Sequence, residues 1–168
     1  MLKFYKDFPK KGVNFIDIFP YIQDYADEVS SFFSKTKANV VLLPEARAFM
    51  FAAAIGLNRC VPLRKVNKLP GELIEIPYKK EYGDDKLYFN IEHLLNVAHK
   101  QNLTHLSVSI IDDVLATGGT AKAIIDKINN LNVSGCTFYV DEVRVLAEIT
   151  ELKGRDLLGV NVESLIKI

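Results

Sequence analysis

The sequence contains little cysteine, no long apolar run and no net charge. Only Cys60 and Cys136 are present, in neither a C-x-x-C pair nor a metal-ligand cluster, so we expect buried thiols in a reducing compartment. No stretch reaches the roughly 18 apolar residues of a membrane-spanning helix, and MLKFYKDFPKK lacks the apolar core of a signal peptide. We therefore expect a cytoplasmic protein. Lys plus Arg and Asp plus Glu both total 21, which argues against nucleic-acid binding and makes any anion site a local feature.

The composition is that of an ordered globular chain. Apolar residues make up 49% of the 168 residues and charged residues 25%, far from the polar profile of disordered proteins. The length suits one domain with a real core, and no repeat or linker divides it. We predict a single domain over residues 1–168.

Apolar periodicity alternates between helical and extended segments along the chain. Helices are predicted over 21–37, over 45–57 and from Thr120 onward; strands over Val40–Pro44, over 60–64, from Ser107 to the acidic residues that follow it, over 136–145 and over 157–165. A polar, basic loop spans 63–72, and residues 73–91 alternate around YGDD as in a hairpin or flap. This order predicts an α/β fold, a mainly parallel sheet covered by helices on both faces. In such sheets ligands bind beyond the carboxyl ends of the strands.

The loop between the strand at Ser107 and the following helix is a candidate phosphate site. It consists of small and hydroxyl residues: Ala116, Thr117, Gly118, Gly119 and Thr120. A helix amino terminus presents unpaired N–H groups and the positive end of the helix dipole, and glycine permits a close approach. The alternative is a flexible turn that Thr120 merely caps.

Two adjacent carboxylates, Asp112 and Asp113, favour the ligand interpretation. Neighbouring carboxylates at the end of an apolar strand repel each other and are costly to desolvate, so they need a cation or hydroxyl donors nearby. A ribose diol together with a divalent ion supplies both. The P-loop pattern and G-x-G-x-x-G are absent, which argues against a nucleoside triphosphate or a dinucleotide. His93, His99 and His105 lie six residues apart, not at metal-ligand spacing, and are interpreted as structural or surface residues.

The segment IIDDVLATGGT resembles the fingerprint of the type I phosphoribosyltransferases. The resemblance implies their fold, a phosphoribosyltransferase domain with a mobile flap. It also implies that Asp112 and Asp113 hold the ribose hydroxyls of phosphoribosyl pyrophosphate (PRPP), while residues 116–120 hold its 5′-phosphate.

Four further segments are similar, in order, to the adenine phosphoribosyltransferase family: FPKKGVNFIDIFP, PEARAFMFA, RKVNKLPGE and YKKEYGDDKL. This likeness implies purine salvage, with phosphoribosyl transfer from PRPP to adenine to give AMP and pyrophosphate, and a homodimer. Mg²⁺ would be the cofactor, bound mainly through PRPP and water rather than by a protein metal site. It assigns pyrophosphate to Arg47, Arg64, Lys65 and Lys68, adenine to Asn14, Phe15 and Ile16, catalysis to Glu81 and Arg47, and the flap to Glu81 and Tyr82.

Chemistry supports these assignments, and departures from the pattern keep alternatives open. Arg64, Lys65 and Lys68 concentrate positive charge for an anion, and a carboxylate such as Glu81 under a closed flap can take a purine proton. The family usually has Gly at Ala48 and Arg or Lys at Ile16. The open alternatives are a transferase for hypoxanthine, guanine or xanthine, a non-catalytic regulatory protein that binds PRPP, and an inactive paralogue.

Overall fold

A mainly parallel sheet forms the centre of the computed structural model, which describes residues 1–80 and 83–168. Its six strands are β3 (Val40–Pro44), β4 (Cys60–Leu63), β7 (His105–Leu115), β8 (Asn132–Val133), β9 (Cys136–Glu148) and β10 (Asn161–Lys167). Five of them follow the order β10-β9-β7-β3-β4, and every neighbouring pair on that path is parallel. The short strand β8 pairs antiparallel with β9. The predicted α/β sheet is confirmed.

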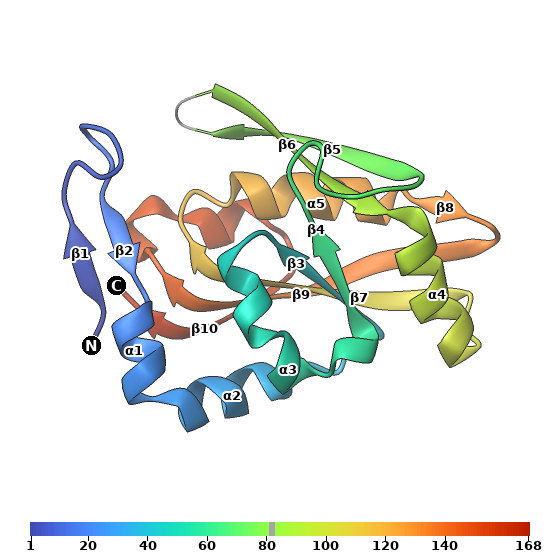
Figure 1. Ribbon diagram of the computed structural model, residues 1–168, viewed down its shortest axis with the longest axis horizontal. Helices are drawn as coiled ribbons and strands as arrows, with labels where there is room; N and C mark the ends of the chain where they lie inside the picture. The colour runs from blue at the N-terminus through green and yellow to red at the C-terminus, as the bar shows by residue number, and fades with distance from the viewer. Residues whose placement is uncertain (81–82) are drawn as a thin grey trace.

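Helices cover both faces of this sheet (Figure 1). The helices are α1 (Phe19–Asp24), α2 (Ala26–Ser34), α3 (Ala52–Ile55), α4 (Ile91–Gln101) and α5 (Gly119–Asn129), and the 3-10 turns are η1 (Arg47–Phe51), η2 (Leu57–Arg59), η3 (Thr150–Leu152) and η4 (Gly154–Leu157). In Figure 1, α5 lies on one side of the sheet and α1, α2 and α3 lie on the other. The sheet is therefore the middle layer.

Each face of the sheet has its own apolar core, because side chains alternate along a strand. On β3, Val40 and Leu42 pack into the core shared with α4 and α5, whereas Val41 and Leu43 pack into the core shared with α2 and α3. The second core includes Phe33, which is fully buried and stacks on Phe51 with ring centroids 3.9 Å apart. Burial on both faces explains why VVLLP is a continuous apolar run.

Two antiparallel pairs lie outside the central sheet. The N-terminal arm consists of β1 (Lys3–Tyr5) paired with β2 (Phe15–Asp17). The hairpin consists of β5 (Leu73–Lys80) paired with β6 (Gly83–Asn90), and it packs on α5. The hairpin predicted over 73–91 is confirmed, while Glu81 and Tyr82, on which the flap prediction falls, lie outside the described residues.

Several predicted helix and strand boundaries are wrong. The helix predicted over 21–37 is two helices separated at Tyr25, and the first begins earlier because Pro20 suits an initial turn. The helix predicted over 45–57 is a 3-10 turn followed by only four α-helical residues, ending at Gly56 with φ of 105°. The last strand begins at Asn161 rather than 157, since η4 occupies the preceding segment.

Helix α4 was not predicted, although its end signals are present in the sequence. The Asn90 side chain accepts hydrogen bonds from the N–H groups of Glu92 and His93, as an N-cap residue does. Asn102 adopts the left-handed conformation that often follows a helix. Capping residues thus mark this helix.

Candidate active site

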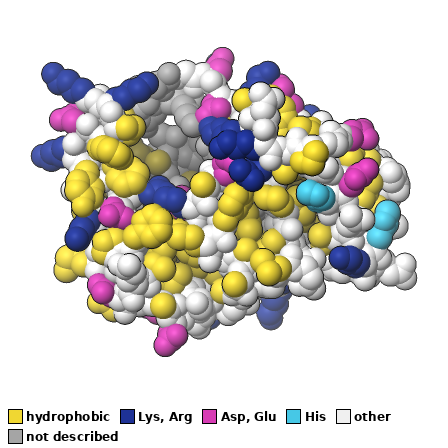
Figure 2. All heavy atoms as spheres, viewed as in Figure 1, with side chains coloured by type: hydrophobic (Ala, Val, Ile, Leu, Met, Phe, Trp, Pro, Cys, Tyr) yellow, Lys and Arg dark blue, Asp and Glu magenta, His cyan; other side chains and the backbone are white. Residues whose placement is uncertain are grey.

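A cavity of about 840 Å³ lies at the carboxyl end of β7. Its walls come from the N-terminal arm, the strand β7 with the loop after it, the hairpin end at Lys79, and the C-terminal segment around η3. Figure 2 shows this face of the molecule hollowed between the arm and the hairpin. The position is the one expected for ligands in a parallel sheet.

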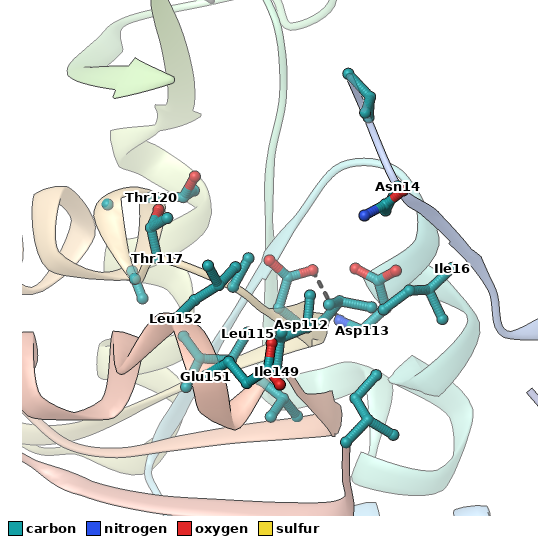
Figure 3. A pocket seen from close by; sticks show the side chains of 18 of the residues that line it. Asn14, Ile16, Asp112, Asp113, Leu115, Thr117, Thr120, Ile149, Glu151 and Leu152 are labelled. Carbon is teal, nitrogen blue, oxygen red and sulfur yellow. Dashed lines mark hydrogen bonds between the residues drawn. The ribbon is translucent and has the colours of Figure 1, made fainter. Parts of the chain in front are cut away.

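Residues 116–120, the glycine loop, form one wall of the cavity and lead into α5. Gly118 has φ of 81°, a conformation that glycine adopts without strain. All five residues line the cavity, and Thr117 and Thr120 lie on one flank of it in Figure 3. The first turn of a helix has N–H groups without intrahelical partners, so the loop suits an anion.

Asp112 and Asp113 stand next to the glycine loop and turn their carboxylates to the same side (Figure 3). The Asp113 N–H donates a hydrogen bond of 2.8 Å to Asp112 Oδ1. Burial, with the adjacent Asp113 charge as the second cause, raises the pKa of Asp112 well above its ordinary value. A ligand that donates hydrogen bonds from hydroxyl groups, or that brings a cation, would offset the burial of these carboxylates and the repulsion between them.

Arg47 connects the acidic pair to the N-terminal arm. Its Nη2 forms an ion pair with Asp113, whose side chain is buried, and its Nη1 donates to the Ile16 carbonyl oxygen at 2.8 Å. The guanidinium also lies over the Phe15 ring, 5.1 Å from the ring centroid. One cation thereby holds the two sides of the cavity together.

The other three predicted pyrophosphate residues do not line this cavity. Arg64 and Lys68 both form ion pairs with Glu45, at 2.5 and 3.0 Å, and Lys65 pairs with Asp85. Burial acts to raise the pKa of Glu45, but the hydrogen bonds from Arg64 and Lys68 hold it below its ordinary value. Figure 2 shows a group of basic side chains next to acidic ones on this face of the molecule.

The predicted base residues divide between cavity wall and support. Asn14 and Ile16 line the cavity, opposite the two threonines in Figure 3. Phe15 is not among the lining residues; its ring packs edge-on against Phe8, with centroids 5.1 Å apart. Asn14 and Ile16 are thus in place to meet a ligand, whereas the Phe15 ring packs against Phe8.

Among the lining residues that sequence reasoning missed are Lys79, Ile149, Glu151 and Leu152. Lys79 was an unremarked position in the flap segment. The other three belong to the C-terminal segment, which carries no motif and reaches the cavity only because β9 runs parallel to β7. No local pattern of residues could have placed them there.

The fold, with an acidic pair and a glycine loop ending its central strand, is that of the type I phosphoribosyltransferases. The chain is 38% identical to adenine phosphoribosyltransferase of Clostridium perfringens strain SM101, over 96% of this chain and 92% of that protein. The chain therefore belongs to the adenine phosphoribosyltransferase family and is an enzyme of this type.

Solved structures agree with this assignment. The adenine phosphoribosyltransferase of Thermoanaerobacter pseudethanolicus superposes with a TM-score of 0.78 at 34% identity, covering 100% of this chain and 96% of that one. The Giardia lamblia enzyme complexed with 9-deazaadenine gives a TM-score of 0.75 at 29% identity, covering 100% and 94%. No family model matches the chain.

Outside Glu81 and Tyr82, no group of three or more His, Cys, Asp or Glu side chains is arranged to hold a metal ion. Among the helices built from residues 1–80 and 83–168, none has the length and apolar character needed to cross a membrane.

The variant Asp112→Asn is expected to be more stable than the parent at neutral pH. The folded-state pKa of Asp112 is raised above the unfolded value of about 3.9. Ionisation of Asp112 therefore leaves the free energy of unfolding unchanged below the unfolded pKa. It lowers that free energy progressively as pH rises to the folded pKa, and by a constant amount above it. Urea denaturation at about pH 4 and about pH 8 should show the larger gain at the higher pH.

The control is Asp126→Asn, because Asp126 is an exposed carboxylate on α5, paired with Lys122. Its effect should vary little between the two pH values. An Asp112→Asn gain that is equal at both values would contradict the assigned cause.

Proposed function

We propose that the protein transfers the phosphoribosyl group of PRPP to adenine, giving AMP and pyrophosphate, with the cavity at the end of β7 as its active site. The observation that carries this proposal is the acidic pair and glycine loop, both lining one cavity, in a chain of this family. The Giardia lamblia relative complexed with 9-deazaadenine supports a purine-shaped ligand. The comparisons give no support to a transferase for another purine or to a regulatory protein.

Each part of the donor has a chemical counterpart in the cavity. In the proposal the amides and hydroxyls of residues 116–120 bind the 5′-phosphate, and the carboxylates of Asp112 and Asp113 accept hydrogen bonds from the ribose diol. The hydroxyl donors of the ribose would then offset the desolvation of the two carboxylates and the repulsion between them. Donor binding is thus favoured because it removes an unfavourable electrostatic interaction that is present in the free protein.

Negative charge develops on pyrophosphate as its bond to the anomeric carbon breaks, so cations there stabilise the transition state. Arg47 already lies in the cavity. Arg64, Lys65 and Lys68 reach pyrophosphate only by leaving Glu45 and Asp85, an exchange of one anion for another. Asp112 and Asp113 offer hard oxygen atoms of the kind Mg²⁺ accepts. Mg²⁺, bound mainly by PRPP and water, would supply further positive charge at the leaving group.

The base would bind between the arm and the C-terminal segment. Backbone groups at Asn14 and Ile16 are proposed to contact the edge of adenine. The Phe15 ring is proposed as the apolar surface for the purine, which requires it to turn from Phe8 toward the cavity. The Ile16 side chain is buried, which leaves backbone atoms for polar recognition. Glu81 is proposed to accept the purine ring proton, and Tyr82 to close over the site with it. A homodimer and a cytoplasmic location stay predictions.

The test of the function is an activity panel. With PRPP and Mg²⁺, purified protein should release pyrophosphate with adenine, and kcat/KM for hypoxanthine, guanine and xanthine should be lower by at least about tenfold. A higher value with an oxopurine would establish the other transferase. Binding of PRPP with no pyrophosphate released with any base would establish the regulatory protein or inactive paralogue.

The variant Glu81→Gln should lose about 10²- to 10⁴-fold in kcat with adenine, the usual contribution of a general base. Its KM for PRPP should stay within about twofold of the parent value, a small change in binding free energy. Asp84→Asn, an exposed carboxylate on β6 of the same hairpin, is the control and should keep its kcat. Equal turnover of the Glu81→Gln and parent enzymes would show that Glu81 does not accept the purine proton.

Lys79 is proposed as a further cation for the donor, because this exposed residue lines the cavity from the hairpin side. The variant Lys79→Gln should raise KM for PRPP by about tenfold, less at high salt, as expected for one exposed charge near a polyanion. Steady-state kinetics at low and high salt measure the effect. Lys86→Gln on the same hairpin is the matched control, since Lys86 pairs with Glu75 at 2.9 Å and does not line the cavity. Equal KM increases in both variants would refute the assignment.

A further inference from the structure

Gly154, the first residue of η4, packs against the backbone of the glycine loop. A Cβ atom at Gly154 would lie 2.9 Å from the Gly118 nitrogen and 3.0 Å from the Thr117 carbonyl carbon, and closer still to the Ala116 carbonyl oxygen. A Cβ atom at Gly118 would in turn lie 2.6 Å from the Gly154 carbonyl oxygen. These neighbours are backbone atoms, which a side chain could not push aside without moving the loop.

Arg155, the next residue, anchors this turn to the sheet. Its Nε and Nη2 donate to the two carboxylate oxygens of Glu148 at 2.8 and 2.7 Å, and its Nη1 donates to the Val162 carbonyl oxygen at 2.9 Å. Ser164 Oγ donates to the same carboxylate at 2.7 Å. A two-point Arg–carboxylate pair fixes direction as well as distance. The position of η4 is therefore set by β9 and β10.

Glu148 ties the anchor to the strand that ends in the glycine loop. Glu148 is buried, is the last residue of β9, and lies beside Leu115, the last residue of β7. The Ile149 N–H donates to the Leu115 carbonyl oxygen at 2.9 Å. The hydrogen bonds from Arg155 lower the pKa of Glu148 to about 2, so the carboxylate stays ionised throughout the neutral range. The anchor and the glycine loop thus begin from adjacent residues of two paired strands.

We propose that Gly154, with Arg155 and Glu148 holding it, is a positioning element for the 5′-phosphate: it fixes the backbone amides of residues 116–120 in the geometry that binds the anion. The inference rests on the proposed function, because it takes the glycine loop as the phosphate site. Gly154, Arg155 and Glu148 are positioning residues, since none of them lines the cavity. Anion binding by backbone amides needs their directions fixed beforehand, because any ordering that occurs on binding subtracts from affinity.

A purely structural role for this contact makes a different prediction. If η4 only completes the apolar core, then disturbing it lowers stability and weakens every ligand to the same extent. If it positions the glycine loop, the damage falls on phosphate recognition and leaves adenine recognition, which depends on the arm, nearly intact. The ratio of the two effects separates these roles.

The test compares Gly154→Ala with the parent and with Gly159→Ala. Gly159 belongs to the same C-terminal segment, but a Cβ there would meet nothing within 4 Å, although its φ of 67° strains any other residue. It therefore controls for a general loss of stability in the segment. The measurements are the dissociation constant for ribose 5-phosphate by titration calorimetry, KM for PRPP and for adenine, and Tm.

Gly154→Ala should raise the ribose 5-phosphate dissociation constant and KM for PRPP by at least about tenfold, while KM for adenine stays within about twofold. Gly159→Ala should leave all three constants at the parental values, even if Tm falls. Arg155→Gln should weaken ribose 5-phosphate binding, and Arg155→Lys should restore part of it, because Lys keeps the charge but makes only one contact with Glu148. If Gly154→Ala does not fold, the Arg155 pair carries the test.

Two failures are distinguishable. If the parent does not bind ribose 5-phosphate, the proposed function fails, and this inference falls with it. If the parent binds it and Gly154→Ala or Arg155→Gln binds equally well, or loses adenine and phosphate affinity in the same proportion, the positioning role is wrong while the proposed function stands.

Discussion

The site depends on a single buried contact, the ion pair between Arg47 and Asp113 at the end of β7. Two neighbouring carboxylates in a largely desolvated position are unfavourable without a cation, and Arg47 supplies it. The same guanidinium donates to the Ile16 carbonyl oxygen and lies over the Phe15 ring. The guanidinium that offsets the charge of the acidic pair therefore also holds the arm that forms one wall of the cavity.

The basic side chains of the loop after β4 are held in ion pairs. Glu45 pairs with Arg64 and Lys68, and Asp85 pairs with Lys65, so each of these three cations has an anionic partner in this structure. Asp112 is the opposite case: burial and the adjacent Asp113 charge raise its pKa, so its ionised form is disfavoured. A chain with equal numbers of acidic and basic residues can in this way gather several cations in one short loop and keep them neutralised by neighbouring carboxylates.

Residues with a local signature were predictable, and those defined by distant contacts were not. The acidic pair and the glycine loop follow one another along the chain, so a sequence motif is enough to predict them. Lys79, Glu151 and Leu152 have no such signature and enter the cavity through the packing of the hairpin and of β9. The same reason explains the helix errors, because Tyr25 and Gly56 end helices where packing and backbone conformation override apolar periodicity.

By itself, the sequence determined the α/β architecture, the buried parallel strands and the motif at the end of β7, because these depend on local periodicity and residue order. Only the tertiary structure decided that Arg47 pairs with Asp113, that Arg64 and Lys68 pair with Glu45, and that Gly154 packs against the glycine loop. These contacts join residues from different strands and turns, and their geometry exists only once the sheet has brought the carboxyl ends of β7 and β9 side by side.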